Sequence, residues 1–237
     1  MPAEGDFTKQ ATHCRVAFLL GEDHMRAIIF ANGDAADPEI VRQWTPQADL
    51  IIAADGGTRN ALSVGVIPHV VIGDLDSLAE ADRAQLNRSG VPLIVYPTRK
   101  DYTDLELALR YALEQHATEI IIFSALGGRW DQSLANLMLL TLPELAHVAT
   151  CIVDHHLSIQ AICDRAEITG QVGDTLSLIA LRGDAHGVTI EGCEYPLREA
   201  TLPLGATLGI SNVLSQTTAK ITVKQGQILA LHAQRAE

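Results

Sequence analysis

From residue 25 to about residue 155, short aliphatic runs alternate with stretches of helical period. This alternation is typical of strands and helices that build a parallel sheet. In the stretch 103–116, Leu105, Leu109 and Leu113 recur every fourth residue, which predicts a helix with one apolar face against the sheet. We expect strands over 26–33, 49–57, 69–73, 92–97, 119–128, 147–154 and 157–163, and helices over 58–65, 77–90, 103–116 and 131–140.

The pattern changes after about residue 165. There is no long helical period, and short β-rich runs are separated by Gly, Asp and Pro, as in a small sandwich or barrel. These runs cover 166–181, 186–192, 207–211, 219–226 and 227–233.

Two domains follow from this change of pattern. We expect an α/β fold class, with a Rossmann-like, mostly parallel N-terminal domain over residues 25–160 and an all-β sandwich over 161–237. Residues 1–24 differ from the rest, and a domain that began at Met25 would open directly on a strand. They are interpreted as an N-terminal extension or as the product of a misplaced start codon.

Composition narrows the class of protein. A chain of 237 residues with 47% hydrophobic residues can build sizeable cores, and we expect a soluble globular protein. Its net charge of −12 argues against non-specific nucleic-acid binding, which requires Lys and Arg. The apolar run 16–20 is too short for a membrane span, so no membrane partner is expected. The four cysteines match neither a zinc site nor a CxxC pair and indicate a reducing cytoplasm.

Candidate chemistry begins at HVVIGDLDS, residues 69–77, where a β-like run stops at Gly73 before Asp74 and Asp76. In an extended segment, carboxylates two residues apart project to the same side and can bind one hard cation. An ordinary turn is the alternative, because Gly, Asp and Ser are common turn residues.

Three other predicted strand ends carry similar residues. The carboxyl ends of parallel strands lie along one edge of a sheet, where ligands bind. Taken singly, Asp101 or Thr103 is explained as a helix N-cap, and the Gly127-Gly128 pair as a tight turn. Their succession is better explained by a cation that offsets the repulsion between clustered carboxylates. The residues are Asp55 with Gly56 and Gly57, then Lys100, Asp101 and Asp104, then Gly128, Arg129 and Asp131.

A site with magnesium carboxylates, glycine-rich loops, one lysine and one arginine suits phosphoryl or pyrophosphoryl transfer. This chemistry requires positioning and charge neutralisation more than a covalent nucleophile. The sequence has no Walker A motif, no kinase catalytic loop, no GxSxG elbow and no HExxH helix, which excludes those enzyme classes.

The motifs together resemble those of the thiamine pyrophosphokinase family. The resemblance covers essentially all of the chain from Met25 onward. It rests on ADGG (54–57), GDLDS (73–77), KDYTDLELAL (100–109) and GGRWDQSLAN (127–136), and on GVTIEGCEYPL (187–197) and LGISN (208–212) in the second domain.

The resemblance implies transfer of a pyrophosphoryl group from ATP to the hydroxyl of thiamine, with Mg²⁺, giving thiamine diphosphate and AMP. It also implies a homodimer whose thiamine pockets form between subunits. Tyr195 would stack on a thiamine ring. The implied metal ligands are Asp74, Asp76 and Asp101; the implied ATP-site residues are Asp55, Gly56, Gly57, Lys100, Asp104, Gly128 and Arg129; the implied thiamine-site residues are Asp131, Gln132, Tyr195, Ser211 and Asn212.

The chain departs from the family pattern at three places. Many members have His where Gln132 stands, so the general base is left open between a carboxylate such as Asp101 and a metal-bound hydroxide. The segment 213–218 lacks the acidic or aromatic residues often found there, and residues 1–24 have no family counterpart. Two alternative functions are a pyrophosphokinase for a hydroxymethyl pterin and a non-catalytic thiamine or nucleotide sensor.

Overall fold

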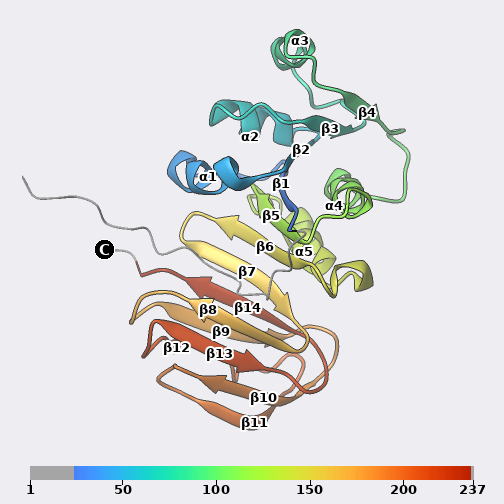
Figure 1. Ribbon diagram of the computed structural model, residues 1–237. Helices are drawn as coiled ribbons and strands as arrows, with labels where there is room; N and C mark the ends of the chain where they lie inside the picture. The colour runs from blue at the N-terminus through green and yellow to red at the C-terminus, as the bar shows by residue number, and fades with distance from the viewer. Residues whose placement is uncertain (1–23, 236–237) are drawn as a thin grey trace, which may run out of the picture.

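A computed structural model describes residues 24–235 of the chain, which contain a ten-stranded sheet and a four-stranded sheet (Figure 1). Six strands of the larger sheet are parallel, in the order β6-β5-β1-β2-β3-β4. These strands are β1 (Arg26–Phe30), β2 (Leu50–Ala54), β3 (Val70–Gly73), β4 (Leu93–Val95), β5 (Glu119–Phe123) and β6 (Ala149–Asp154).

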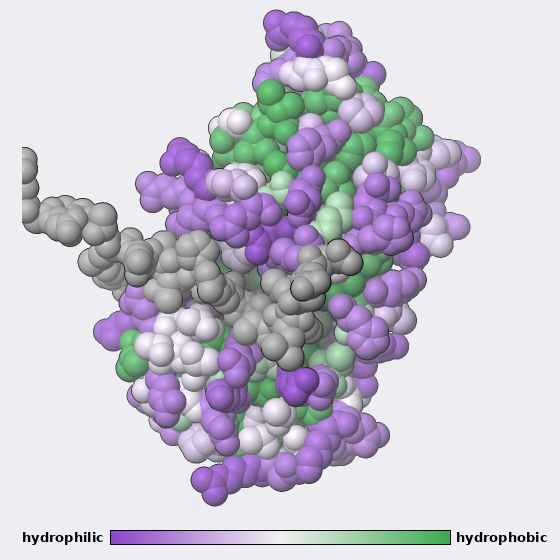
Figure 2. Space-filling model, viewed as in Figure 1, coloured by the Kyte–Doolittle hydropathy of each residue, from purple (hydrophilic) through white to green (hydrophobic). Residues whose placement is uncertain are grey.

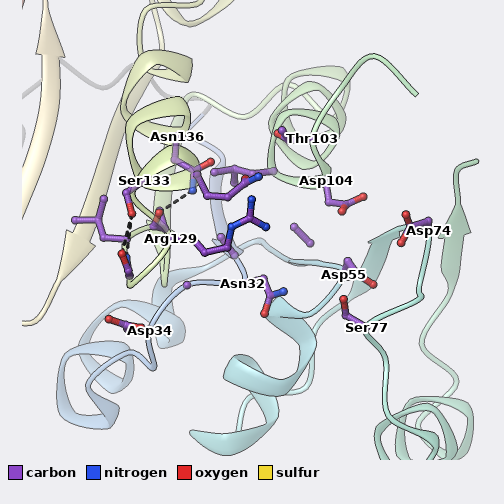
Figure 3. A pocket seen from close by; sticks show the side chains of 18 of the residues that line it. Asn32, Asp34, Asp55, Asp74, Ser77, Thr103, Asp104, Arg129, Ser133 and Asn136 are labelled. Carbon is purple, nitrogen blue, oxygen red and sulfur yellow. Dashed lines mark hydrogen bonds between the residues drawn. The ribbon is translucent and has the colours of Figure 1, made fainter. Parts of the chain in front are cut away.

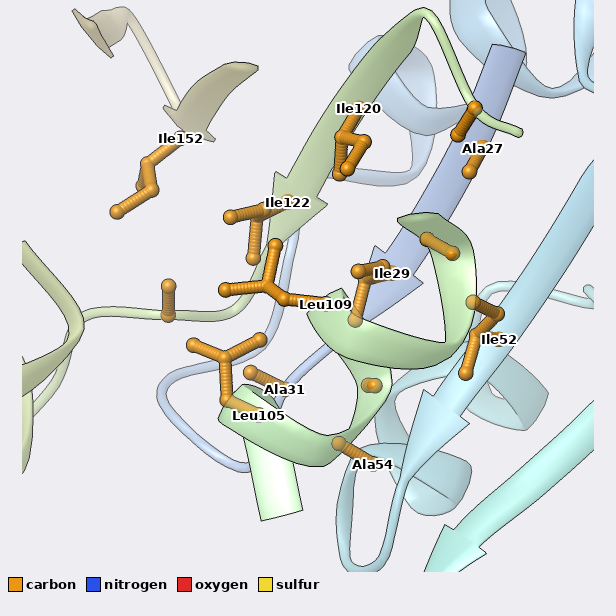
Figure 4. Packing of buried hydrophobic residues seen from close by; sticks show 14 of the residues in the cluster. Ala27, Ile29, Ala31, Ile52, Ala54, Leu105, Leu109, Ile120, Ile122 and Ile152 are labelled. Carbon is orange, nitrogen blue, oxygen red and sulfur yellow. The ribbon is translucent and has the colours of Figure 1, made fainter. Parts of the chain in front are cut away.

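Helices cover both faces of the six parallel strands. The central residues of these strands are therefore buried on both sides of the sheet. Ile29, Ile52 and Ile122 pack with Leu105 and Leu109 of α4 on one face (Figure 4). The alternate strand residues pack against α1 and α2 on the other face. The helices are α1 (Pro38–Trp44), α2 (Gly57–Ser63), α3 (Glu80–Arg88), α4 (Asp104–Glu114) and α5 (Trp130–Leu139), and the 3-10 turns are η1 (Thr45–Gln47) and η2 (Pro143–Leu145).

The larger sheet continues without a break into the C-terminal part of the chain. Strand β7 pairs antiparallel with β6, and the order then runs β7-β14-β9-β12. These strands pack against the four-stranded sheet β11-β10-β13-β8 around a second core. The strands are β7 (Leu157–Ile162), β8 (Arg165–Thr169), β9 (Thr175–Ala180), β10 (Ala185–Glu191), β11 (Leu197–Leu202), β12 (Asn212–Val213), β13 (Thr218–Thr222) and β14 (Ile228–Ala233).

The predicted fold class is confirmed: a Rossmann-like α/β part is followed by a β-sandwich. The domain boundaries stay a prediction, and the boundary at residue 160 falls inside β7. The predicted extension 1–24 lies outside the described residues except for His24.

The structure differs from the sequence-based expectations at three elements. Helix α1 was not predicted; Asp37 caps it, Pro38 starts it, and only Val41 and Trp44 are buried. Strand β11 was also missed, because its only buried side chain is Leu202 and half of its residues are polar. The predicted strand over 207–211 is wrong, since that segment consists largely of turns.

The surface also differs between the two parts of the molecule. In the view of Figure 2, apolar surface is most continuous over α2 and β2–β4, whereas the sandwich is mostly hydrophilic with smaller apolar spots. Among residues 24–235, no helix has both the length and the apolar character that a membrane crossing requires.

Candidate active site

A pocket of about 610 Å³ lies at the carboxyl ends of the parallel strands. Its lining comes from the segments that follow β1, β2, β3, β4 and β5, so strand-end loops far apart in the sequence meet at one edge of the sheet. Of the sequence-predicted residues, the pocket is lined by Asp55, Asp74, Asp76, Lys100, Asp104, Gly128, Arg129 and Gln132.

Three of these carboxylates form a group that we call the carboxylate cluster: Asp55, Asp74 and Asp104. One oxygen of each lies within 4.8 Å of the others, and Figure 3 shows the three side chains together on one side of the pocket. Asp55 is 4% exposed, and its Oδ1 has no hydrogen-bond partner among the described residues. Hard oxygen donors with one unpaired buried atom fit a divalent cation such as Mg²⁺.

The backbone of two strand ends creates the space for this cluster. Asp55 follows β2 with φ 42°, a left-handed conformation in which its carboxylate is held at the strand end. Gly73 ends β3 with φ 154°, and a Cβ there would lie 2.8 Å from the Cβ of Asp55 and 3.0 Å from Oδ1 of Asp104. The glycine therefore leaves room for the carboxylates.

Lys100 is the cation that faces the carboxylate cluster. Its Nζ donates to Oδ1 of Asp104 at 2.7 Å and lies 3.8 Å from Oδ2 of Asp74. Burial raises the pKa of Asp104 above its usual value, and the hydrogen bond from Lys100 opposes but does not cancel this effect. One lysine thus leaves the pair of neighbouring carboxylates only partly neutralised.

Asp76 and Asp101 are placed differently from the carboxylate cluster. Leu75 has φ 62°, so the segment after Gly73 is a turn and not the extended stretch assumed from the sequence. Asp76 still lines the pocket, where its Oδ1 accepts a hydrogen bond from Ser77 Oγ at 3.0 Å. Asp101 is exposed and is not among the residues that line the pocket.

Helix α5 fixes the glycine-rich loop before it. Ser133 Oγ accepts from the backbone N–H of Gly127 at 3.1 Å, and the Asn136 side chain donates to the carbonyl of Ala125 at 2.7 Å. A Cβ on Gly33 would lie 2.1 Å from the carbonyl oxygen of Leu126, so the loop after β1 approaches this loop closely. Gly128 has open space beside its Cα.

Arg129 and Asp131 form an exposed ion pair at the pocket edge, with Nη2 to Oδ2 at 2.5 Å. The hydrogen bond from Arg129 lowers the pKa of Asp131 below its usual value. Gln132, the next residue, is exposed and lines the pocket. This edge can therefore meet a ligand that approaches from solvent.

The glycines predicted for the nucleotide site pack against the neighbouring strand end. A Cβ on Gly56 would lie 2.4 Å from the side chain of Asn32, and a Cβ on Gly57 would lie 2.0 Å from the carbonyl oxygen of Phe30. Both glycines are buried and allow α2 to start directly against the end of β1.

Several pocket residues that follow β1 were not expected from the sequence. Asn32 and Asp34 line the pocket, and the Asn60 side chain from α2 donates to the carbonyls of Ala31 and Gly33 at 2.9 and 3.1 Å. The observed strand β1 ends at Phe30, so the segment ANGD, residues 31–34, is a strand end. The predicted strand over 26–33 covered most of this segment; with the strand ended at Phe30, the strand-end rule would have pointed to these residues. Further unpredicted lining residues are Ser77, Thr98, Tyr102, Thr103, Ser133 and Asn136.

The remaining predicted thiamine residues lie on the β-sandwich. Tyr195, between β10 and β11, is 67% exposed; Ser211 directly precedes β12, which begins at Asn212. Asn212 is buried and binds the backbone of Tyr195. None of these three residues lines the pocket, and Figure 1 shows β10–β12 at the opposite end of the molecule from α2 and α3.

Comparisons with known proteins agree with this arrangement. Residues 41–152 match the family described as thiamin pyrophosphokinase, catalytic domain, and residues 155–228 match thiamin pyrophosphokinase, vitamin B1 binding domain. Thiamine pyrophosphokinase from Bacillus subtilis is 33% identical over 193 residues, which cover 80% of this chain and 90% of the relative.

Solved structures give the same result. A crystal structure of thiamine pyrophosphokinase from Bacillus subtilis superposes with a TM-score of 0.81 at 29% identity, covering 89% of this chain and all of the other. Thiamin pyrophosphokinase from Candida albicans, at 15% identity, shares the fold with a TM-score of 0.75 over 89% of both chains. The chain therefore belongs to the thiamine pyrophosphokinase family, enzymes that make thiamine diphosphate by pyrophosphoryl transfer.

Proposed function

We propose that this protein transfers the pyrophosphoryl group of ATP to the hydroxyl of thiamine, giving thiamine diphosphate and AMP, with Mg²⁺ bound in the pocket. The observation that carries the proposal is the carboxylate cluster beside Lys100 in a pocket of about 610 Å³. A cavity of this size accommodates a nucleotide-sized ligand.

Asp55, Asp74 and Asp104 would hold the cation, with Asp76 at the edge of the same pocket. Bound Mg²⁺ supplies positive charge that the triphosphate and the transition state require. Asp101 was also expected to be a metal ligand and stays a proposed one. Its exposed loop would have to adopt a different arrangement for its carboxylate to reach the cation.

The chain's own cations and amides would position the phosphates. Lys100 lies inside the pocket with its side chain 12% exposed, whereas the Arg129 side chain is 73% exposed at the edge. Lys100 would contact phosphate oxygens near the carboxylate cluster, and Arg129 would leave Asp131 to contact a bound anion. The backbone N–H of Gly128 would add a further donor, whereas that of Gly127 already donates to Ser133 Oγ.

The acceptor hydroxyl must lose a proton, and a pocket carboxylate is the group that would receive it. Gln132 cannot act as a base, but its amide can orient the acceptor from the pocket edge. The proton would therefore pass to a carboxylate oxygen, with Gln132 as a hydrogen-bonding group.

A homodimer with shared sites would bring the sandwich residues to the pocket. Tyr195 does not line the pocket of its own chain, yet its exposed ring is suited to stacking on a flat, partly cationic ligand. The Tyr195 face of one subunit would cover the pocket of the other subunit.

Exposed apolar side chains support this assembly. Along α5, Trp130, Leu134 and Met138 recur every fourth residue and are 75%, 58% and 49% exposed, directly beside pocket residues of the same helix. On the sandwich, Leu204 and Leu208 are 58% and 60% exposed. Exposed aromatic and aliphatic side chains are typical of subunit interfaces.

The test is a coupled measurement on the purified full chain with ATP, Mg²⁺ and thiamine. The proposal expects AMP and thiamine diphosphate in equal amounts, and loss of both products when EDTA is added. Binding of thiamine and ATP without AMP would favour a sensor. Turnover with a hydroxymethyl pterin but not with thiamine would show that the pterin is the acceptor.

A further inference from the structure

A buried polar pair lies in the β-sandwich, outside the pocket. His232 Nε2 of β14 lies 2.9 Å from Oδ2 of Asp174, and both residues are 2% exposed. Asp174 Oδ2 also accepts from the backbone N–H of Gln171 at 2.8 Å, and Oδ1 accepts from that of Arg235 at 3.0 Å. Burial alone would raise the pKa of Asp174, but these hydrogen bonds outweigh it and lower the pKa.

The pair holds one tight turn in place. The backbone N–H of Asp174 donates to the carbonyl of Gln171 at 3.0 Å, so main chain and side chain both close the turn 171–174. A Cβ on Gly170 would lie 2.6 Å from both Asp174 Oδ2 and His232 Nε2. The approach of the turn to β14 therefore depends on this glycine and on the pair.

The same turn supports β12. The carbonyl of Asp174 accepts from the N–H of Leu214 at 2.9 Å, and the N–H of Gly173 donates to the carbonyl of Leu214 at 2.9 Å. Strand β12 has two residues and pairs with β9, in which Leu176 is opposite both Asn212 and His232. A strand this short has few ladder bonds of its own, so the turn fixes its position.

Strand β12 in turn fixes the backbone of Tyr195. The Asn212 side chain accepts from the N–H of Tyr195 at 3.0 Å and donates to its carbonyl at 2.7 Å. The N–H of Glu194 donates to the carbonyl of Val213 at 2.8 Å. A continuous series of hydrogen bonds therefore runs from the buried pair through β12 to the exposed aromatic residue.

We propose that Asp174 and His232 are positioning residues, which hold β12 and thereby set the place of Tyr195, Ser211 and Asn212 for the acceptor. This inference rests on the proposed function, because it assigns thiamine to that face. Charged and neutral hydrogen bonds have defined directions, whereas apolar contacts allow the turn to slide. A polar pair in an otherwise apolar core is suited to fixing register.

The test compares kinetic constants of His232→Ala, His232→Gln, Asp174→Ala and Asp174→Asn in the full-length protein. Loss of the pair should raise the KM for thiamine about ten-fold, as expected when a buried hydrogen-bond network is broken, while the KM for ATP stays within about two-fold. His232→Gln keeps a side-chain donor and should show a smaller rise than His232→Ala.

The matched control is Ile168→Val, a substitution of a buried sandwich residue in the other sheet, outside this series of hydrogen bonds. It should lower the melting temperature without separating the two KM values. If the variants of the pair also lose only thermal stability, or if both KM values rise equally, the positioning role is refuted. Absence of product with the unmodified protein would instead refute the proposed function, so the two failures are distinguishable.

Discussion

The two candidate binding regions are built by different means. In the pocket, strand ends of the parallel sheet bring charged side chains together, and one chain supplies the whole carboxylate cluster. On the sandwich, hydrogen bonds between backbone and Asn212 position a single exposed aromatic ring. Clustered charges repel one another and must be held in place by a rigid framework. An exposed aromatic ring, in contrast, becomes a binding site only when another surface covers it.

The largest expected effect comes from removing charge from the pocket. Asp74→Asn should lower kcat by roughly a hundred-fold or more, because it removes a cation ligand and electrostatic positioning. The fold should stay intact, since one charge fewer reduces repulsion among Asp55, Asp74 and Asp104. Steady-state kinetics measure the loss of kcat, and thermal unfolding shows whether the fold stays intact. Unchanged kcat would contradict the cation assignment.

The variants Asp76→Asn and Asp101→Asn test which residues hold the cation: the ligand set expected from the sequence, or the carboxylate cluster. If Asp55 and Asp104 hold the cation, then Asp101→Asn should have a much smaller effect on kcat than Asp104→Asn. Equal losses would favour the sequence-based set. The Mg²⁺ concentration for half-maximal rate, measured for each variant, separates weakened cation binding from other causes.

A second, smaller effect is expected where the two regions would meet. Trp130→Ala should weaken self-association, because an exposed interface tryptophan contributes about 2 kcal/mol or more when buried by a partner. Sedimentation velocity at several concentrations measures the change. Ile67→Ala is a control at an exposed apolar residue between α2 and β3, outside both proposed contact surfaces. A monomeric unmodified protein would contradict the shared site.

Tyr195→Ala probes the sandwich alone. Loss of stacking on a partly cationic ring should raise the KM for thiamine by about 2- to 30-fold, from about 0.5–2 kcal/mol of cation–π energy. The KM for ATP should change little. Equal changes in both constants would argue against stacking and would remove the distinction between the two regions.

The smallest expected effect is a pH dependence of stability from Asp174. Its pKa is lower in the folded state than the ordinary 3.8, so its ionised form stabilises the fold above pH 3.8. That contribution is lost as pH falls through the folded-state pKa. The stability difference between the unmodified protein and Asp174→Asn should therefore shrink below pH 3.8, as measured by urea unfolding at several pH values.

Much of the fold follows from the sequence because burial dictates it. Parallel strands buried on both faces are continuous aliphatic runs, and Leu105 and Leu109 of α4 are buried as their spacing predicts. The confirmed family resemblance rests on the same strand-end motifs. Strand β11 was missed because an outer strand with exposed polar residues has no such pattern.

The site is less fully determined by local pattern. Asp101 and Asp104 are three residues apart in the sequence, but Asp101 lies in the loop before α4, and only the folded start of α4 puts Asp104 beside Asp55. Leu75, whose φ of 62° turns the chain between Asp74 and Asp76, has a buried side chain that packs in a cluster with Val71 and Leu86, a tertiary contact that no local pattern indicates. The register of Asn212 with Tyr195 connects residues 17 apart and is a tertiary feature.

One sheet passes through both parts of the molecule, joined where β6 and β7 pair over four residue pairs from Cys151–Gln160 to Asp154–Leu157. A shared sheet resists hinge bending, so the pocket and the sandwich of a single subunit should move and unfold as one cooperative block. Any opening that admits substrate must then be a motion of loops or of one subunit against another.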